Sequence, residues 1–249
     1  MPANTAIIIG HKKLTKDVFE LTCKTDGPFG FEAGQFITIR IDDGKSPCFR
    51  AYSISSKPEQ SEEFQLCIKI VENGRGSNWL NTLEKGDKIN FLGPNGKFVF
   101  KTSSEKKVLF IAVGVGIAPF KSIIEDQLIN KKNNKQKLHL LLGLRYEEDI
   151  FYEDLFRELA NDYKNFTFDL TLSRPQQSTE SAATKKDVPG DGSSHKHEGR
   201  VTDLLKKTDI IPDQTEAYIC GLKAMIDDVH SILKEKGLPE EAIHFEKYN

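Results

Sequence analysis

The feature that most constrains this chain is a change in the spacing of its apolar residues a little after residue 100. Before that point, apolar and polar residues alternate, as in residues 35–41 and 64–70. A period of two is typical of strands with one buried face. After it, residues 108–113 form an unbroken apolar run, which is typical of a strand buried on both faces. We therefore predict two domains of different architecture.

The first part is predicted to be a small antiparallel barrel or sandwich. Gly, Pro and Asp separate its strand-like runs, and residues 42–44 form one such turn. A short helix is expected at about residues 78–83. Further strand-like runs lie at 6–10, 18–24, 49–54, 88–92 and 97–100.

The second part is predicted to be an α/β fold with a parallel sheet. Apolar runs at 138–142, 166–172, 216–220 and 242–245 alternate with helical patterns. Strand and helix in alternation indicate βαβ units. The polar residues 102–105 separate the two parts, so the expected domains are residues 1–102 and 105–249. The expected helices lie at 150–160, 201–207 and 223–236, with another after the strand at 108–113.

One segment of the second domain, residues 175–199, is polar almost throughout. It has too few apolar residues to offset the entropy lost on ordering, which predicts a mobile surface loop. His195 and His197 in this segment have ring nitrogens able to bind a metal. A solvated position is the preferred interpretation, and no metal site is expected.

Composition excludes several classes of partner. The chain has 249 residues and a formal charge of −2, which favours neither nucleic acid nor an anionic membrane as partner. No apolar run approaches the roughly 20 residues that span a bilayer. The start resembles no signal peptide, so a cytoplasmic location is expected. The cysteines form no CxxC pair, which disfavours an iron–sulfur cluster and suits reduced thiols.

Glycines follow the strand at 108–113. Gly114 and Gly116 between a strand and a helix let backbone amides approach a pyrophosphate at the positive end of the helix. The pattern is not the complete GxGxxG fingerprint, because Pro119 stands where the third glycine would be. An ordinary strand-to-helix turn would have the same residues.

Two further motifs lie in the first domain. Gly74, Gly76 and Ser77 precede a helical pattern, with Ser77 a possible N-cap, and would present free amides to a phosphate. A simple capped helix fits these residues equally. The segment Arg50-Ala51-Tyr52-Ser53 combines an arginine for phosphate, an aromatic ring for stacking and a hydroxyl group.

Together, in this order, the motifs resemble those of the ferredoxin–NADP reductase family, over essentially the whole chain apart from residues 175–199. Five family motifs are matched, at Ala33-Gly34-Gln35, at Arg50-Ala51-Tyr52-Ser53, at Gly74 and Ser77, at Gly114, Gly116, Ile117 and Pro119, and at Cys220-Gly221. The resemblance implies a six-stranded antiparallel β-barrel that holds FAD, followed by a parallel-sheet domain that holds the nicotinamide cofactor.

The resemblance also implies roles for single residues. Arg50 would bind the FAD pyrophosphate, Tyr52 would pack on the isoalloxazine ring, and Ser53 would lie near N5, where hydride arrives. Cys220 would help to position the nicotinamide ring; a buried cysteine with a purely apolar role is the alternative. The resemblance therefore makes three residues candidates for catalysis: Ser53, Cys220 and Glu246.

The C-terminus matches the family less completely. Plant-type members end in Glu-x-Tyr, and Glu246 and Tyr248 match this pattern, but Asn249 follows. The resemblance implies that Tyr248 covers the flavin until nicotinamide displaces it. It also makes the Glu246 carboxylate a candidate for orienting the nicotinamide or relaying a proton.

Three arginines favour NADPH over NADH as the cofactor. NADPH carries a 2′-phosphate, for which bidentate arginine is the best partner. Bacterial members of the family place arginines where Arg145, Arg174 (after Ser173) and Arg200 stand. Each of them is also compatible with a solvated surface position.

The electron acceptor is expected to be a separate carrier protein, a ferredoxin or a flavodoxin, and the chain to be a monomer. A reductase component of a multicomponent oxygenase is the alternative. A haem-protein reductase is also open, since the segment 93–96 resembles that branch of the family. A non-catalytic redox-sensing subunit is a third reading; it is weakened because Arg50, Tyr52 and Ser53 are all present.

Overall fold

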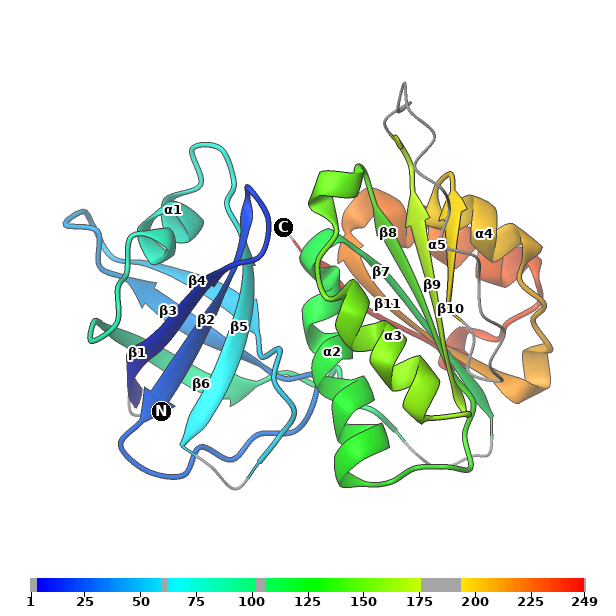
Figure 1. Ribbon diagram of the computed structural model, residues 1–249, viewed down its shortest axis with the longest axis horizontal. Helices are drawn as coiled ribbons and strands as arrows, with labels where there is room; N and C mark the ends of the chain where they lie inside the picture. The colour runs from blue at the N-terminus through cyan, green and yellow to red at the C-terminus, as the bar shows by residue number, and fades with distance from the viewer. Residues whose placement is uncertain (1–3, 60–61, 102–105, 176–193, 249) are drawn as a thin grey trace. The chain divides into compact units, whose positions relative to one another are not determined.

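The computed structural model contains two six-stranded sheets, each in a unit of its own (Figure 1). It describes residues 4–59, 62–101, 106–175 and 194–248. The first unit comprises Met1–Lys101 and Ala118–Lys131, and the second comprises Thr102–Ile117 and Lys132–Asn249. The linker expected at 102–105 lies outside the described residues.

The first sheet is antiparallel, with the strand order β4-β3-β6-β1-β2-β5. Most of the strands expected from alternation are present. The run at 97–100 is an exception and forms no strand, because Phe98 packs on a helix instead, its ring centroid 5.8 Å from that of Phe120. The strands are β1 (Asn4–Lys13), β2 (Val18–Thr25), β3 (Phe36–Ile41), β4 (Cys48–Ser53), β5 (Glu63–Lys69) and β6 (Lys88–Asn95).

This sheet closes into a barrel. Its edge strands β4 and β5 meet at a bridge between Ile54 and Leu66, and the Ser55 amide donates to the Gln65 carbonyl at 2.8 Å. Closure removes the free edges that an open sheet would expose. The interior is apolar, and it includes the packed rings of Phe29, Phe64 and Phe91. The fold expected for the first domain is thus confirmed as a barrel.

Two helices belong to the first unit. Helix α1 (Arg75–Asn81) begins three residues before the expected start, because Gly74 takes the N-cap position. Helix α2 (Ala118–Glu125) runs into a π-helical segment, η2 (Asp126–Asn130). The sequence assigned α2 to the second domain. It groups with the barrel because the Lys121 ammonium donates to the Ser55 carbonyl and Gln65 side chain at 3.3 and 3.2 Å.

The second sheet is parallel throughout, with the order β10-β9-β8-β7-β11-β12. Its chain order reverses between β7 and β11, which makes these strands the topological switch point of the sheet. The strands are β7 (Lys107–Val113), β8 (Leu138–Leu144), β9 (Phe166–Leu172), β10 (Ser194–Glu198), β11 (Thr215–Leu222) and β12 (Ile243–Tyr248).

Helices cover both faces of the second sheet (Figure 1). Phe156 of α3 packs against Phe168 of β9, with ring centroids 5.4 Å apart, on one face. Helices α4 and α5 pack on the other face, where Val201 and Val229 meet Leu141 of β8 in one apolar cluster. The helices are α3 (Glu153–Asp162), α4 (Val201–Lys207) and α5 (Lys223–Glu235), with short 3-10 turns η1 (Gly114–Ile117), η3 (Glu147–Asp149), η4 (Pro212–Gln214) and η5 (Glu240–Ala242).

The segment 175–199 differs in part from the mobile loop that was expected. Its last residues form the edge strand β10, which pairs in parallel with β9. The strand is polar, yet it is held because His195 and His197 hydrogen-bond to the Asp169 carboxylate. The interpretation of these histidines as part of a solvated loop is therefore wrong. Residues 176–193 of the expected loop lie outside the described residues.

Two further expectations concern the whole chain. Within the described ranges, no helix is long and apolar enough to cross a membrane. None of the four cysteines, all of which lie in the described ranges, forms a disulfide, and Cys23, Cys67 and Cys220 are buried. The expectation of reduced thiols stays a prediction.

Candidate functional site

The flavin motif lies on the edge strand β4. Arg50 pairs with Ile39 and Tyr52 with Ile37, so both side chains leave the sheet on the face of two buried isoleucines. Arg50 and Ala51 are exposed, and Tyr52 is half-buried. Ser53 points to the opposite face and is buried. The strand thus presents an exposed guanidinium and a partly buried phenol side by side.

The start of α1 covers these two side chains. A Cβ added to Gly76 would lie 2.8 Å from the Tyr52 hydroxyl and 2.9 Å from Arg50 Cγ, closer than real Cβ contacts come. Burial raises the pKa of Tyr52 to about 12, with a smaller opposing effect from the Arg50 charge. The phenol is therefore protonated at neutral pH. The structure brings the motifs at residues 50–53 and 74–77 into one site.

Ser77 does not cap α1, contrary to its proposed role as N-cap. Its buried hydroxyl accepts the Val71 amide hydrogen at 3.0 Å, and Gly74 occupies the N-cap position. A Cβ on Gly74 would come within 2.7 Å of Val71 Cβ. Ser77 and Gly74 therefore hold a tight turn at the entry of the helix, where the first backbone N–H groups have no intrahelical partner.

Arg75 contributes to the same site, although the sequence did not single it out. Its guanidinium donates to the Asp43 carboxylate, with Nε 2.5 Å from Oδ2, and to the Ser46 carbonyl at 2.6 Å. The hydrogen bond from Arg75 lowers the pKa of Asp43 to about 2. Arg75 thus ties α1 to the turn between β3 and β4. Only the folded structure identifies this pair, because the two residues are far apart in the sequence.

The glycines of the second unit lie at the topological switch point, directly after β7. Gly114 has φ +53, and a Cβ there would meet no protein atom within 4 Å. At Gly116, a Cβ would lie 2.3 Å from the Cys220 carbonyl oxygen. Gly114 therefore provides an unusual backbone conformation beside open space, and Gly116 permits close approach to β11. Ile117 is buried in the turn that follows. Pro119, in the first turn of α2, belongs to the first unit.

Cys220, Glu246 and Tyr248 meet at the carboxyl ends of β11 and β12. Cys220 pairs with Glu246 in the ladder, and Leu222 with Tyr248. Burial raises the pKa of the Cys220 thiol well above its ordinary value; the Glu246 charge raises it further, and a hydrogen bond with Tyr248 opposes both. Cys220 is therefore a neutral thiol at physiological pH. Gly221, at φ +154, packs against Val113 and Met225.

Arg145 directly follows β8, and Arg174 and Arg200 lie two residues after the ends of β9 and β10. Because these strands are adjacent and parallel, their carboxyl ends lie along one edge of the sheet. The Arg174 amide donates to the Arg145 carbonyl at 2.8 Å, and all three side chains are exposed. The Tyr146 hydroxyl, which the sequence did not single out, is 3.4 Å from Arg174 Nη1. Ser173 is turned into the sheet, its hydroxyl donating to the Leu144 carbonyl at 3.3 Å.

Two family models together match most of the chain. Residues 5–114 match the oxidoreductase FAD-binding domain, and residues 110–231 match the oxidoreductase NAD-binding domain. A ferredoxin–NADP⁺ reductase from Neisseria gonorrhoeae, solved with bound FAD and NADP, shares the fold with a TM-score of 0.80 and 22% identity, and 99% of each chain is covered.

Two curated relatives match nearly the whole chain. Ferredoxin–NADP reductase B of Sorangium cellulosum (strain So ce56) is 31% identical, over 98% of this chain and 97% of that protein. The reductase component of propane 2-monooxygenase from Mycolicibacterium goodii is 30% identical over 97% of this chain, which spans only 66% of the relative. The two domains and these identities show that the chain is an FAD- and NAD(P)-dependent oxidoreductase and belongs to the ferredoxin–NADP reductase family.

Proposed function

We propose that this enzyme passes electrons between NADPH and a separate one-electron carrier protein, a ferredoxin or a flavodoxin, by way of FAD. The observation that carries the choice of NADPH is the alignment of Arg145, Arg174 and Arg200 along one edge of the second sheet. Three guanidinium groups there suit the dianionic 2′-phosphate that distinguishes NADPH from NADH.

The first unit offers groups that fit FAD. The Arg50 guanidinium is exposed, and although its Nη1 donates to the Phe49 carbonyl at 2.9 Å, it has further N–H donors to offer a pyrophosphate. The neighbouring cation, Arg75, is engaged by Asp43. The bare backbone of Gly76 lies at the same place, beside the first-turn amides of α1. The Tyr52 ring supplies an aromatic surface for the isoalloxazine, and Ser53 follows on the same strand. Bound FAD supplies the chemistry, since a flavin takes up a hydride and gives up electrons one at a time.

The second unit offers groups that fit the nicotinamide cofactor. Open space beside Gly114 suits a pyrophosphate at the switch point of the sheet. Cys220 is neutral and buried, so its proposed role is to support the nicotinamide ring by contact and not to act as a nucleophile. Glu246, its ladder partner, is the proposed group for orienting the carboxamide or holding a proton.

A carrier protein as acceptor is supported by the match to ferredoxin–NADP reductase B, which extends along nearly the full length of both chains. A second candidate is the reductase component of a multicomponent oxygenase, favoured by 30% identity to the propane 2-monooxygenase reductase component. We further propose that the protein is a monomer in a reducing compartment, the cytoplasm; four cysteines that form no disulfide fit such a compartment.

One assay separates these candidates. The FAD-loaded enzyme is supplied with NADPH and then with a panel of ferredoxins and flavodoxins, each alone, and the reduction of each carrier is followed by its own absorbance. Fast reduction of an isolated carrier supports the proposal. Reduction of no carrier, combined with NADPH-dependent turnover of an oxygenase component, would instead establish the second candidate.

A further inference from the structure

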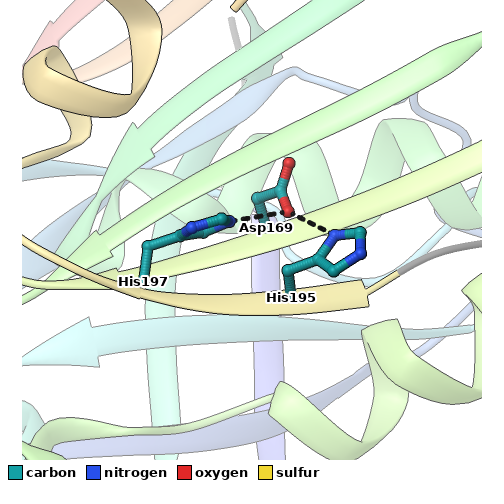
Figure 2. Close-up of side chains that lie close together, drawn as sticks. All are labelled: Asp169, His195 and His197. Carbon is teal, nitrogen blue, oxygen red and sulfur yellow. Dashed lines mark hydrogen bonds and ion pairs between the residues drawn. The ribbon is translucent and has the colours of Figure 1, made fainter. Parts of the chain in front are cut away.

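One carboxylate and two imidazoles, side chains of the kinds that bind metals, lie together at the outer edge of the second sheet, away from the switch point. Asp169 stands near the middle of β9, and His195 and His197 stand on the edge strand β10. Side chains alternate along a strand, so the two histidines, separated by one residue, leave β10 on the same face. His195 pairs with Asp169 in the parallel ladder. The three side chains point toward one another in Figure 2.

The distances suit a small cation. His195 Nδ1 lies 3.0 Å from Asp169 Oδ1, and His197 Nε2 lies 3.1 Å from the same oxygen (Figure 2). All three ligand atoms lie within 4.8 Å of one another. In a tetrahedral zinc site with ligand distances near 2 Å, neighbouring ligand atoms are about 3.3 Å apart. A metal ion can therefore replace the hydrogens that His195 and His197 share with Asp169, and only small side-chain movements are needed.

The carboxylate is already positioned by a third imidazole. His139 of β8 lies with Nε2 2.6 Å from Asp169 Oδ2, which leaves Oδ1 directed at the two histidines of β10. The Asp169 side chain is only 10% exposed, and it is hydrogen-bonded to three imidazoles, those of His139, His195 and His197. Carboxylates that bind metals in proteins are likewise held in place by a hydrogen bond from a neighbouring residue, as His139 holds Asp169 here.

We propose that Asp169, His195 and His197 form a binding site for a divalent transition-metal ion of the zinc class. Two imidazoles and one carboxylate suit zinc, cobalt, nickel or copper, whereas magnesium and calcium prefer oxygen ligands alone. The His195 and His197 side chains are 43% and 38% exposed, so solvent reaches the site and water can supply a fourth ligand. None of these three ligands belongs to the proposed FAD or NADPH site.

The ion would fasten the edge strand to the sheet. Among the described residues, strand β10 pairs only with β9, and it leads through Gly199 into Arg200 at the start of α4. A metal bound between β9 and β10 adds a cross-link that the unfolded chain lacks, and it therefore stabilises the position from which Arg200 projects. Metal occupancy and the local order of β10 are thus coupled.

The test uses the full FAD-loaded chain, freed of any polyhistidine tag and treated with a chelator. Cobalt(II) is titrated in, and difference spectra are recorded at wavelengths longer than the flavin bands. One equivalent of cobalt should give the intense bands of a tetrahedral ion, and zinc should abolish them, whereas excess magnesium should not. His195→Ala and His197→Ala should each weaken zinc binding, measured by calorimetry, at least tenfold.

Two further variants sharpen the result. His230→Ala is the matched control, because His230 also pairs with a carboxylate, Glu240 at 2.9 Å, but far along the chain from this group; it should bind zinc as wild type does. His139→Gln should keep one ion per chain and lower its affinity roughly tenfold or more. Unchanged flavin absorbance and circular dichroism establish that each variant is folded. Failure of wild type to bind zinc, or equal binding by the His195→Ala/His197→Ala double variant, would overturn the proposal.

Discussion

The Tyr52 hydroxyl lies so close to Gly76 that a Cβ at residue 76 would come within 2.8 Å of it. Arg50 Cγ is almost as near, at 2.9 Å from the same position. The glycine is therefore required by two side chains of β4 that lie across the first turn of α1. This contact joins two sequence motifs into one surface, and it explains why the proposed FAD site needs both.

Replacing Gly76 with alanine should weaken FAD binding by roughly ten- to a hundredfold. The added methyl group must displace Tyr52 or Arg50, and overpacking of this kind costs about 1–3 kcal/mol. The dissociation constant is measured from the recovery of free flavin fluorescence. Gly30→Ala is the control, because a Cβ there would meet nothing within 4 Å. Equal FAD affinity in Gly76→Ala and wild type would mean that FAD binds elsewhere.

Replacing Arg174 and Arg200 with alanine should raise KM for NADPH and leave KM for NADH nearly unchanged. Each charge-assisted contact to a phosphate is worth roughly 1.5–3 kcal/mol, which corresponds to a ten- to a hundredfold change per arginine. Arg40→Ala is a suitable control, since that guanidinium lies in the first unit and pairs with Asp42 at 3.0 Å. A wild-type enzyme that uses both cofactors equally well would contradict the assignment of the three arginines.

Replacing Tyr248 with serine should tighten nicotinamide binding several-fold and reduce the preference for NADPH. If the ring covers the flavin, as the family resemblance implies, nicotinamide must displace it, and an aromatic stack is worth on the order of 0.5–1.5 kcal/mol. Tyr248→Phe keeps the ring but loses the hydrogen bond to Cys220. The phenylalanine variant should therefore behave like wild type. If both variants bind nicotinamide with the affinity of wild type, Tyr248 does not cover the flavin.

The Asp43–Arg75 pair should make a contribution to stability that acid removes. The pKa of Asp43 is lowered to about 2 in the folded protein, so the unfolded chain takes up this proton first as pH falls. The stabilising effect is thus present above the unfolded pKa, near 3.9, and is lost as pH falls toward about 2. Asp43→Asn should lower the melting temperature at neutral pH, and the difference from wild type should shrink below about pH 4. Asp42→Asn is the neighbouring control. A difference that stays constant with pH would show that the charge of Asp43 is not the cause.

Much of the fold could be predicted because it depends on local pattern. Alternation identified β3 and β5, and the apolar run identified β7 as a central strand. The errors occurred where tertiary contacts, and not the local sequence pattern, determine whether a segment forms a strand. Phe98 alternates like a strand residue but packs on Phe120, and β10 is a strand because of side-chain hydrogen bonds to Asp169, which lies far away in the sequence.

The site was predictable only as separate motifs. Sequence order placed Arg50 and Gly76 in the same domain, but nothing in the sequence shows that they touch. Ser77 was expected to cap α1, yet its hydroxyl accepts the Val71 amide hydrogen, because the helix has its N-cap three residues earlier, at Gly74. His195 and His197 are two residues apart, a spacing that fits one face of a strand, but the polar residues around them led to the prediction of a loop.

The most direct test of the central claim is an anaerobic titration of the purified, FAD-loaded enzyme. We expect a yellow protein whose flavin absorbance is bleached by about one equivalent of NADPH, because a hydride carries two electrons to one flavin. Oxidised flavodoxin or ferredoxin added next should restore the flavin absorbance, with about two equivalents of carrier consumed for each flavin because each accepts a single electron. A protein that stays colourless after incubation with FAD, or a flavin that NADPH does not bleach, would contradict the account.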